Sequence, residues 1–415
     1  MVDVAIDGKI LTRASFGPEI ARGEVTAGSL PLSVSVTHRI AEVEAVWRSL
    51  AATGIESAGQ SYDFIKLWVE AREIAAEDQL YVVGSLGGQP VALLPLHRRR
   101  RQGMTLYSWF PGAHVGCNAP LIDAQRFGAL SVAERRSFWQ GLMAAVDGAD
   151  LVYLKAVPTR ASGIEDAFAE LGAPIPVETL YRSAFSNWEE CNTTQRSKSR
   201  RKHDRQQGEK LDALGTVSFE VVTPGEAARP VLDAMFRQRA KRFAVMGVPD
   251  PFAPSDIARF YDQSVAADSK VDVKLHVLRL DGEIVAVRYN IVHGDRLFCL
   301  ISSMSDDPGI QGGSPGKQCL LRVMQSVFDE GYRVFDMGAG FTDEKRHWCN
   351  VQIGLSNHYV PLTFKGRAIV KGHALWQSAR ARIKANKTLL KLAKGLRGRL
   401  QRAGRPVVAV EESSD

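Results

Sequence analysis

The residues best placed to do chemistry stand in one stretch, D-D-P-G-I-Q-G-G-S-P-G-K-Q-C-L-L-R-V-M-Q-S-V-F, from Asp306 to Phe328. Its first part is rich in glycine, and its second part has the apolar spacing of an amphipathic helix. Backbone N–H groups of such a loop can converge on an anion at the positive end of the helix. The small residues of this candidate anion site are Gly309, Gly312, Gly313, Ser314 and Gly316, and Lys317 adds a positive charge. The alternative is a flexible loop capped by Ser314.

The glycine stretch does not match the loops that bind nucleotides. A Walker A loop needs glycine where this chain has Gln311, and a serine or threonine where it has Gln318. Without that hydroxyl group the magnesium ion loses a ligand, so we exclude a nucleoside triphosphatase. The G-x-G-x-x-G pattern of dinucleotide-binding folds is also missing.

A second set of reactive side chains lies in F-T-D-E-K-R-H-W, residues 341–348, after the strand-like run R-V-F-D-M-G. His347 has the unperturbed pKa nearest neutrality and is a candidate general base. Asp343 and Lys345 are further candidates, and Trp348 is able to stack on a sugar ring. The alternatives are a solvated run of charges and a tryptophan in the core. For Asp336, at the strand end, we favour a structural role in the turn.

Two other segments contribute candidates. Arg288 and Tyr289 alternate in a strand-like run, so one faces the core and the other a groove. Tyr289 is a candidate general acid, and Arg288 is a candidate for binding substrate. Arg239 and Arg242 lie about one helical turn apart and are candidates to guide an anionic acceptor, although exposed arginines usually have no such role.

Composition indicates a globular chain. The 415 residues are 45% hydrophobic and 24% charged, enough for two or three domains. Five scattered cysteines give neither a disulfide framework nor a C-x-x-C metal pair, so we expect reduced thiols and no metal site. The acidic N-terminus and the lack of a long apolar run predict a cytoplasmic protein.

One order of elements occurs twice. From Leu30, the patterns predict a strand, two helices, a hairpin at Gly87-Gly88, a strand, a helix and a strand. From Thr216 the same order returns, with its hairpin turn at Asp281-Gly282. The alternative is that any α/β chain alternates helices and strands. We predict an α/β fold with a mixed sheet and two similar domains, because doubly wound folds place a helix between every parallel pair.

The predicted divisions are an N-terminal segment (1–29), a first domain (30–190), a basic linking helix (191–215), a second domain (216–370) and a basic amphipathic tail (371–415). The net charge of +7 arises in the tail, because residues 365–405 hold 13 Lys and Arg and no acid. The tail predicts either a helix on an anionic membrane surface or a fraying basic end. Neither the basic helix nor Arg98–Arg101 has the interleaved aromatic residues that stack nucleic acid bases, so we expect solvated faces there.

These motifs resemble the GNAT acyltransferases, in particular their CelD-like, Fem-related branch in polysaccharide biosynthesis. Gln311–Gly316 resembles the coenzyme A pyrophosphate pattern [RQ]-x-x-G-x-[GA], with Ser314 where the central glycine belongs. The sequences S-P-G-K-Q, G-Y-R-V-F-D-M-G-A-G and D-E-K-R-H-W are similar to that branch, in which Lys345 matches a family lysine. The resemblance covers about residues 194–370, and the first domain only by its order of elements.

The resemblance implies two tandem GNAT-like domains, of which the first (30–190) is degenerate and the second (216–370) is the acyltransferase. It also implies attack of an amine on the thioester of acetyl-coenzyme A. A splayed strand, here Leu297–Met304, would offer a backbone N–H to the thioester carbonyl, with Ile301 and Ser303 nearest the site. Lys345 would orient the acceptor or the coenzyme phosphates. The acceptor would be an amino sugar or an exopolysaccharide or cellulose-associated precursor. Fem-type aminoacyl transfer from tRNA and a non-catalytic accessory role to a polysaccharide synthase are the alternatives.

Overall fold

The computed structural model describes residues 4–6, 9–14, 19–22, 30–101 and 103–372. The chain forms two compact units, residues 1–360 and residues 361–415. In the second unit, residues 364–372 are helical. The remainder of the predicted basic tail lies outside the described residues. For the first unit, we call residues 30–190 the first half and residues 191–360 the second half.

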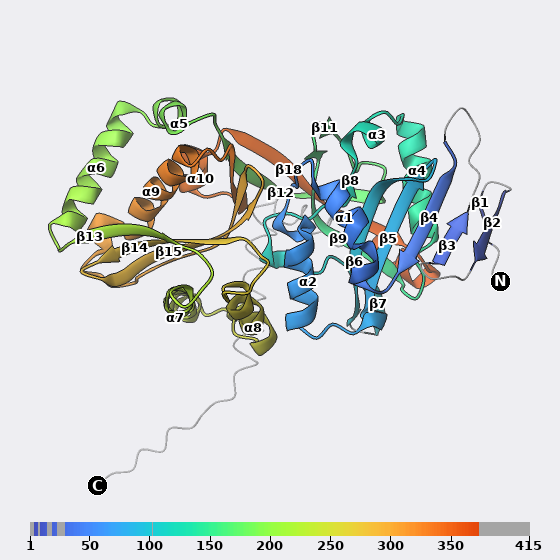
Figure 1. Ribbon diagram of the computed structural model, residues 1–415, viewed down its shortest axis with the longest axis horizontal. Coiled ribbons are helices and arrows are strands. Elements are labelled where there is room, and N and C mark those ends of the chain that lie inside the picture. The colour runs from blue at the N-terminus through green and yellow to red at the C-terminus, as the bar shows by residue number, and fades with distance from the viewer. Residues whose placement is uncertain (1–3, 7–8, 15–18, 23–29, 102, 373–415) are drawn as a thin grey trace, which may run out of the picture. The chain divides into compact units, whose positions relative to one another are not determined.

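The first half follows the predicted order of elements (Figure 1). Three strands precede it, namely β1 (Val4–Ile6), β2 (Lys9–Ala14) and β3 (Glu19–Arg22). Its helices are η1 (Ile40–Val43), α1 (Glu44–Ala51), η2 (Ala58–Gln60), α2 (Tyr62–Ala71), η3 (Ala76–Asp78), η4 (Gly112–His114), α3 (Ala124–Gly128), α4 (Val132–Ala144) and α5 (Trp188–Gln195). Its strands are β4 (Leu32–Thr37), β5 (Gln79–Leu86), β6 (Gln89–Arg101), β7 (Met104–Ser108), β8 (Leu121–Ile122), β9 (Leu151–Pro158), β10 (Arg160–Ala161), β11 (Ile164–Glu165) and β12 (Ala173–Ala184).

The second half repeats that order. Its helices are α6 (Lys198–Asp212), α7 (Ala228–Met246), α8 (Ser255–Ser264), η5 (Gln311–Gly313), α9 (Pro315–Asp329) and α10 (Asp343–Trp348). Its strands are β13 (Val217–Val222), β14 (Val273–Leu280), β15 (Glu283–His293), β16 (Arg296–Met304), β17 (Val334–Ala339) and β18 (Val351–Pro361). The predicted basic helix is α6, and it begins at Lys198 because the Ser197 side chain accepts a hydrogen bond from Arg200 N.

One mixed sheet runs through both halves, which confirms the predicted fold class. Its strand order is β1-β2-β3-β4-β5-β6-β7-β9-β18-β12-β17-β16-β15-β14-β13, with β8 beside β6. Each half contains a parallel pair, β7 with β9 and β16 with β17. The hairpins β5–β6 and β14–β15 turn at the predicted glycines, where Gly88 and Gly282 have φ of 79° and 83°.

The halves exchange their last strands, a feature that the sequence analysis did not predict. Strand β12 belongs to the first half, yet it pairs with β17 and β18 of the second half. Strand β18 in turn lies between β9 and β12. The two similar halves are therefore joined by backbone hydrogen bonds within one sheet.

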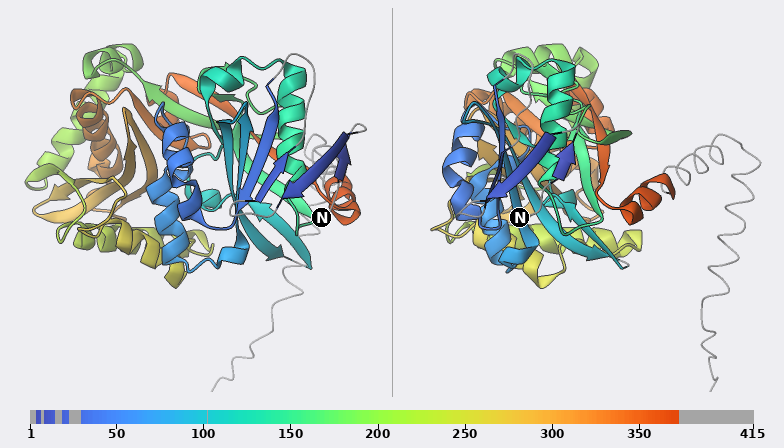
Figure 2. Two further views of the ribbon diagram at one scale, coloured as in Figure 1. Left: turned by 45° about the vertical axis from the view of Figure 1, so that its right-hand side comes forward. Right: turned by 90° about the vertical axis from the view of Figure 1, so that its right-hand side faces the viewer.

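Helices cover the two faces of the second half's sheet. Helices α7 and α8 lie on one face and α9 on the other, as Figures 1 and 2 show. Burial of Leu320, Val323 and Val327, spaced three and four residues apart, holds α9 against the sheet. On the opposite face, an apolar core joins residues of α1 and α2 with residues of α7 and α8. That core continues from one half into the other.

Candidate active site

The site begins where two parallel strands diverge. Strands β16 and β17 pair at three positions, the last of which joins Phe298 with Asp336. Beyond Phe298, β16 continues to Met304 without a paired strand on the side of β17. Its pairing with β15 shifts by one residue, so that Leu300 bulges from the ladder. The open edge of β16 therefore presents backbone groups to a ligand.

Charged side chains lie at this divergence, on the face that α9 and α10 cover. The Lys345 amine donates hydrogen bonds to Gly338 O at 3.1 Å and Ala339 O at 2.5 Å, at the end of β17. The Arg288 guanidinium lies 3.9 Å from the Cys299 sulfur and 3.4 Å from a Glu344 carboxylate oxygen. Positive charge therefore faces the space between the strands.

Burial sets the pKa values of these groups. Burial lowers the pKa of Lys345, and Cys299 and Asp336 act in the other direction without reversing it. Burial acts against ionisation of Arg288, yet Cys299 and Glu344 outweigh it and the pKa of Arg288 is raised. Burial also raises the pKa of the Cys299 thiol. The thiol is therefore neutral at physiological pH, between two cationic side chains.

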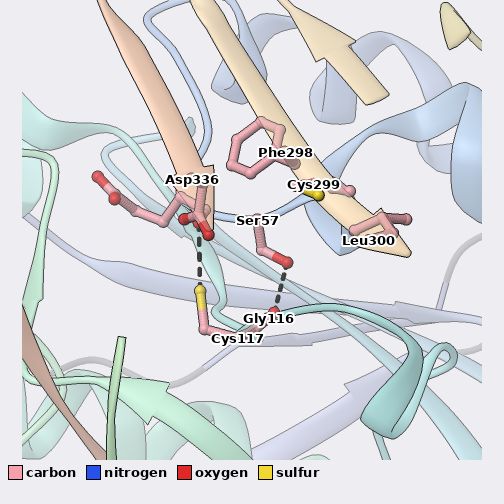
Figure 3. Close-up of a pocket in the computed structure, with 9 residues that line it drawn as sticks. Ser57, Gly116, Cys117, Phe298, Cys299, Leu300 and Asp336 are labelled. Atoms are coloured by element: carbon pink, nitrogen blue, oxygen red, sulfur yellow. Dashed lines mark hydrogen bonds between the residues drawn. The ribbon is translucent and has the colours of Figure 1, made fainter. Parts of the chain in front are cut away.

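The first half supplies one wall of the divergence. A crevice too narrow to hold a water molecule lies between the halves (Figure 3). The second half lines it with Phe298, Cys299, Leu300 and Asp336, and the first half with Glu56, Ser57, Ala58, Gly116 and Cys117. A Cβ atom at Gly116 would lie 2.8 Å from the Cα atom of Gly338, so only glycine fits there.

A buried ion cluster fixes that wall. Arg182 of β12 donates from Nε to Asp336 at 2.8 Å and from another nitrogen to the Glu56 backbone oxygen at 2.6 Å, and it also pairs with the Glu56 carboxylate. Arg296 lies 3.3 Å from the same carboxylate. Burial raises the pKa of Glu56, but Arg182 and Arg296 outweigh it and the pKa is lowered overall. Asp336 also accepts from Gly338 N at 2.7 Å, which agrees with its predicted structural role in the turn.

The glycine loop leads into α9 as predicted, but α6 covers part of it. Ser314 has φ of 50° and ψ of 63°, and its side chain does not cap the helix. Its hydroxyl group accepts a hydrogen bond from Gln207 of α6 at 2.8 Å. A Cβ atom at Gly313 would lie 2.8 Å from Leu211 Cβ, whereas nothing lies within 4 Å of one at Gly312. The open side of the loop is therefore at Gly312.

Other predicted coenzyme-binding residues mostly direct their side chains away from this open side. Ile301 is buried in the core shared with α7 and α8. Ser303 donates to Gln238 of α7 at 2.6 Å, and Gln311 donates to Ser305 O at 2.8 Å. A Cβ atom at Gly316 would lie 2.8 Å from the Met304 sulfur, and Lys317 is half-buried at the start of α9. Any contact of Ile301 or Ser303 with a coenzyme would therefore use the backbone.

The four predicted catalytic residues do not lie together. Lys345 is at the divergence, whereas Asp343 is exposed and forms an ion pair with Arg346. Burial, followed by Arg200 of α6 and Arg346, lowers the pKa of His347, so its ring lies near α6. Tyr289 is fully buried on the α7–α8 face, where its hydroxyl group lies 2.7 Å from that of Ser264. Lys345 is thus the best placed of the four.

The predicted substrate-binding residues are also dispersed. Arg239 reaches the site from the α7 side, where it donates to Ser302 O at 3.3 Å. Burial, followed by Arg242, lowers the pKa of Arg239, and Arg242 itself is exposed. Arg288 lies on the opposite face. Trp348 is 4% exposed and packs against Trp188, which corresponds to the core alternative rather than a sugar-stacking surface.

Several residues at the site were missed by the sequence analysis. Cys299 lies on the same strand as Ile301, two residues before it, and Glu344 lies between Asp343 and Lys345. Their positions beside named residues were an available signal. Glu56 and Arg182 carry no local signal, because 126 residues separate the two partners. Only the fold brings them to the divergence.

The family comparison agrees with this geometry. Residues 198–346 match the family model described as "Acetyltransferase (GNAT) domain". The second half carries a GNAT acetyltransferase domain. The divergence of β16 and β17, the glycine loop and Lys345 all lie within the matched residues. The protein is therefore an acyltransferase of the GNAT type, and GNAT domains use acyl-coenzyme A as the donor. No curated protein matches the chain.

Several solved structures are similar to the chain over most of their length, at low sequence identity. The C-terminal domain of a putative lysylphosphatidylglycerol synthetase from Agrobacterium fabrum is 13% identical, with 81% of this chain and 96% of that chain covered and a TM-score of 0.49. FemX is 11% identical, with coverages of 73% and 97% and a TM-score of 0.48. A tandem GNAT protein from the clavulanic acid biosynthesis pathway is 14% identical, with coverages of 80% and 98% and a TM-score of 0.41.

Two further searches concern the described residues alone. Within them, no three His, Cys, Asp or Glu side chains gather in a group that could hold a metal ion. No helix in the same part of the chain is long and apolar enough to cross a membrane.

Proposed function

We propose that the second half transfers an acetyl group from acetyl-coenzyme A to the amine of an amino sugar or a related exopolysaccharide precursor. The divergence of β16 from β17, beside a glycine loop that opens at Gly312, is the observation that carries this proposal. It combines an edge of unpaired backbone groups with an anion-binding helix start at 315. A thioester and a pyrophosphate need these two features side by side.

The residues of the chain fit such a donor. The open backbone edge at Leu300 donates a hydrogen bond to the thioester carbonyl and stabilises the charge that develops there. Lys345 and Arg288 place positive charge near the leaving sulfur, which favours its departure as a thiolate. The attacking amine must be neutral, and it approaches from the α7 side, where Arg239 binds Ser302 O.

The choice of an amino sugar rests on the resemblance of the motifs to the polysaccharide-biosynthesis branch. The location that we propose is the cytoplasm, on the inner face of the membrane when the basic tail binds there. Nucleic acid is not the partner we propose. The Arg196 and Arg200 guanidinium groups of the basic segment already pair with Asp204, which leaves less charge for phosphates of tRNA.

A non-catalytic accessory role is the second candidate. Two observations favour it: the central motif position holds Ser314 rather than glycine, and side chains of the first half crowd the divergence. An accessory protein would keep the sheet and the ion cluster but would not bind the donor with useful affinity.

Calorimetric titration with acetyl-coenzyme A separates the candidates. We compare the wild type with Gly312→Glu, and use Gly312→Ala as the control. Space is open around Gly312, so neither variant strains the fold, but the glutamate places a negative charge beside the pyrophosphate. The proposal predicts micromolar binding that Glu abolishes and Ala retains. No binding by the wild type would contradict it and favour the accessory role, or tRNA-dependent transfer if charged tRNA binds.

A further inference from the structure

An apolar segment is exposed where α7 ends and the chain turns towards α8. The side chains of Val245, Met246 and Val248 are 86%, 58% and 44% exposed. We call residues 244–254 the α7–α8 tip, and Asp250 is its one ionisable residue. Contiguous exposed apolar side chains mark a surface that contacts a partner or a membrane. The other exposed apolar residues of the tip are Ala244, Pro249, Pro251, Ala253 and Pro254.

Contacts at the base of the tip hold its backbone in place. Gly247 ends α7 with φ of 65°, and Val248 N donates to Phe243 O at 3.2 Å. The Phe243 and Phe252 rings lie with their centres 6.4 Å apart, and the Asp250 carboxylate accepts a hydrogen bond from Phe252 N at 2.9 Å. Three prolines restrict the backbone of the tip further. The exposed side chains are therefore kept in solvent by the structure beneath them.

Basic side chains lie beside the tip on α7. Lys241 and Arg242 precede Val245 by four and three residues, so each lies about one helical turn from it. Arg237 lies one turn before Lys241, and all three basic side chains are exposed. Lys241 lies 3.5 Å from Asp306, whereas neither Arg237 nor Arg242 has a carboxylate partner among the described residues. Two guanidinium groups without counterions therefore flank the apolar tip.

This combination of apolar and cationic side chains complements an anionic membrane surface. Apolar side chains are stabilised when they move from water to the boundary between head groups and acyl chains. Lysine and arginine beside them are attracted by anionic lipids. A symmetric contact with a second copy of the chain would bring the same cations of both copies together, and their repulsion opposes it. The charges therefore favour a lipid surface over self-association.

We propose that the α7–α8 tip docks on a membrane surface that contains anionic phospholipid. Its apolar side chains enter the boundary region, and Arg237 and Arg242 contact the head groups. This surface is separate from the basic tail, and the proposal goes beyond acyl transfer. Helix α7 also carries Arg239, which donates to Ser302 O at the divergence. Docking of the tip would therefore bring the α7 side of the candidate active site close to the membrane.

A dye on the tip tests the proposal in the full-length protein. Val245→Cys carries an environment-sensitive fluorophore, and Val132→Cys is the matched control, because Val132 is 51% exposed at the start of α4. Native thiols are buried apart from half-buried Cys299, so labelled wild type gives the background. Vesicles of phosphatidylglycerol and phosphatidylcholine in equal parts should shift the emission from position 245 to shorter wavelengths and leave that from position 132 unchanged. Vesicles of phosphatidylcholine alone should cause a much smaller shift.

Co-sedimentation with the charged vesicles measures what each group contributes to binding. Val245→Asp should weaken binding by about tenfold or more, because an apolar side chain is replaced by an acid that anionic lipid repels. Combining Arg237→Met with Arg242→Met should weaken it by about tenfold or more through the loss of two charges. The controls are Val132→Asp and Arg136→Met, at exposed positions of α4. Each should change binding by less than about twofold, because charges far from the lipid surface are screened by salt.

Three results would overturn the proposal. If the protein sediments with charged vesicles while the dye at position 245 does not respond, another surface such as the basic tail binds the membrane. A dye response that grows with protein concentration in the absence of vesicles would identify the tip as a contact between copies of the chain. Equal responses to charged and neutral vesicles would refute the role of the two arginines.

Discussion

Arg182→Met should destabilise the protein strongly, although Arg182 lies on strand β12 and not in the glycine loop or in a helix. Arg182 is 5% exposed and holds Asp336, the Glu56 carboxylate and the Glu56 backbone oxygen. Removal of one partner of a buried ion pair costs about 3–5 kcal/mol, because the remaining charge stays buried. Glu56 keeps Arg296 at 3.3 Å and Ser162 N at 2.9 Å, so we expect a value near the lower end.

The stability difference between the wild type and Arg182→Met should depend on pH. In the wild type, burial raises the pKa of Glu56, but Arg182 and Arg296 outweigh it and hold this pKa below its ordinary value. The stabilisation by ionised Glu56 is therefore complete above that ordinary value and is lost as the pH falls through the folded-state pKa. In Arg182→Met the pKa of Glu56 should rise, because Arg182 no longer opposes the effect of burial. Mild acid then protonates Glu56 and removes the cost of its buried negative charge. The difference between the two proteins should be largest near pH 7 and shrink towards pH 4.5.

Urea denaturation of both proteins at pH 5 and pH 7 measures these differences. Arg205→Met is the control, because its side chain is 70% exposed and its pair with Glu209 is worth less than about 1 kcal/mol. If the free energy of unfolding falls by less than about 1 kcal/mol in Arg182→Met, the buried ion cluster does not have the proposed role in stability. A loss that is equal at both pH values would refute the electrostatic explanation and favour simple packing.

Three other substitutions have defined outcomes. Ser314→Gly relieves about 1 kcal/mol of left-handed strain but loses the bond from Gln207, so calorimetry should show retained donor binding and urea denaturation a stability change within about 1 kcal/mol. Gly313→Val forces a Cβ atom against Leu211 and should cost about 1–3 kcal/mol in the same denaturation assay. Lys345→Met should reduce the transfer rate in steady-state kinetics by about tenfold or more, while donor affinity falls less.

Local elements followed from the sequence because their causes are local. The hairpin turns at Gly87-Gly88 and Asp281-Gly282 were predicted from two residues each, and both have positive φ. The glycine loop was predicted in the same way, and so was the helix that begins at Pro315. Ser314 shows what a motif alone leaves out: its φ of 50° is the physical reason for glycine at that position in the family pattern.

Long-range pairing could not be predicted. The N-terminal part of strand β12 contains prolines and is mostly exposed, so no alternation of apolar and polar residues marks it as a strand. Leu180 of β12, for example, pairs with Ala339 on one side and with Ile353 on the other. Both partners lie more than 150 residues further along the chain. The ion cluster depends on these pairings, because β12 carries Arg182 to Asp336. Asp343 and His347 lie four residues apart on α10 and share one face of that helix, whereas Lys345 lies on another face and donates to Gly338 O and Ala339 O. Nearness in sequence therefore did not bring all three side chains to one place.

The exchange of strands changes what the first half does for catalysis. The matched GNAT domain ends at residue 346, yet its diverging strands are held by Arg182 from β12 and walled by Gly116 and Glu56 from the first half. A degenerate domain that had only lost its own site would not need glycine at Gly116, where a methyl group would press on the Gly338 backbone. We therefore infer that the first half is a structural part of the proposed acyl-transfer site, and that its sequence is constrained by the chemistry of the second half.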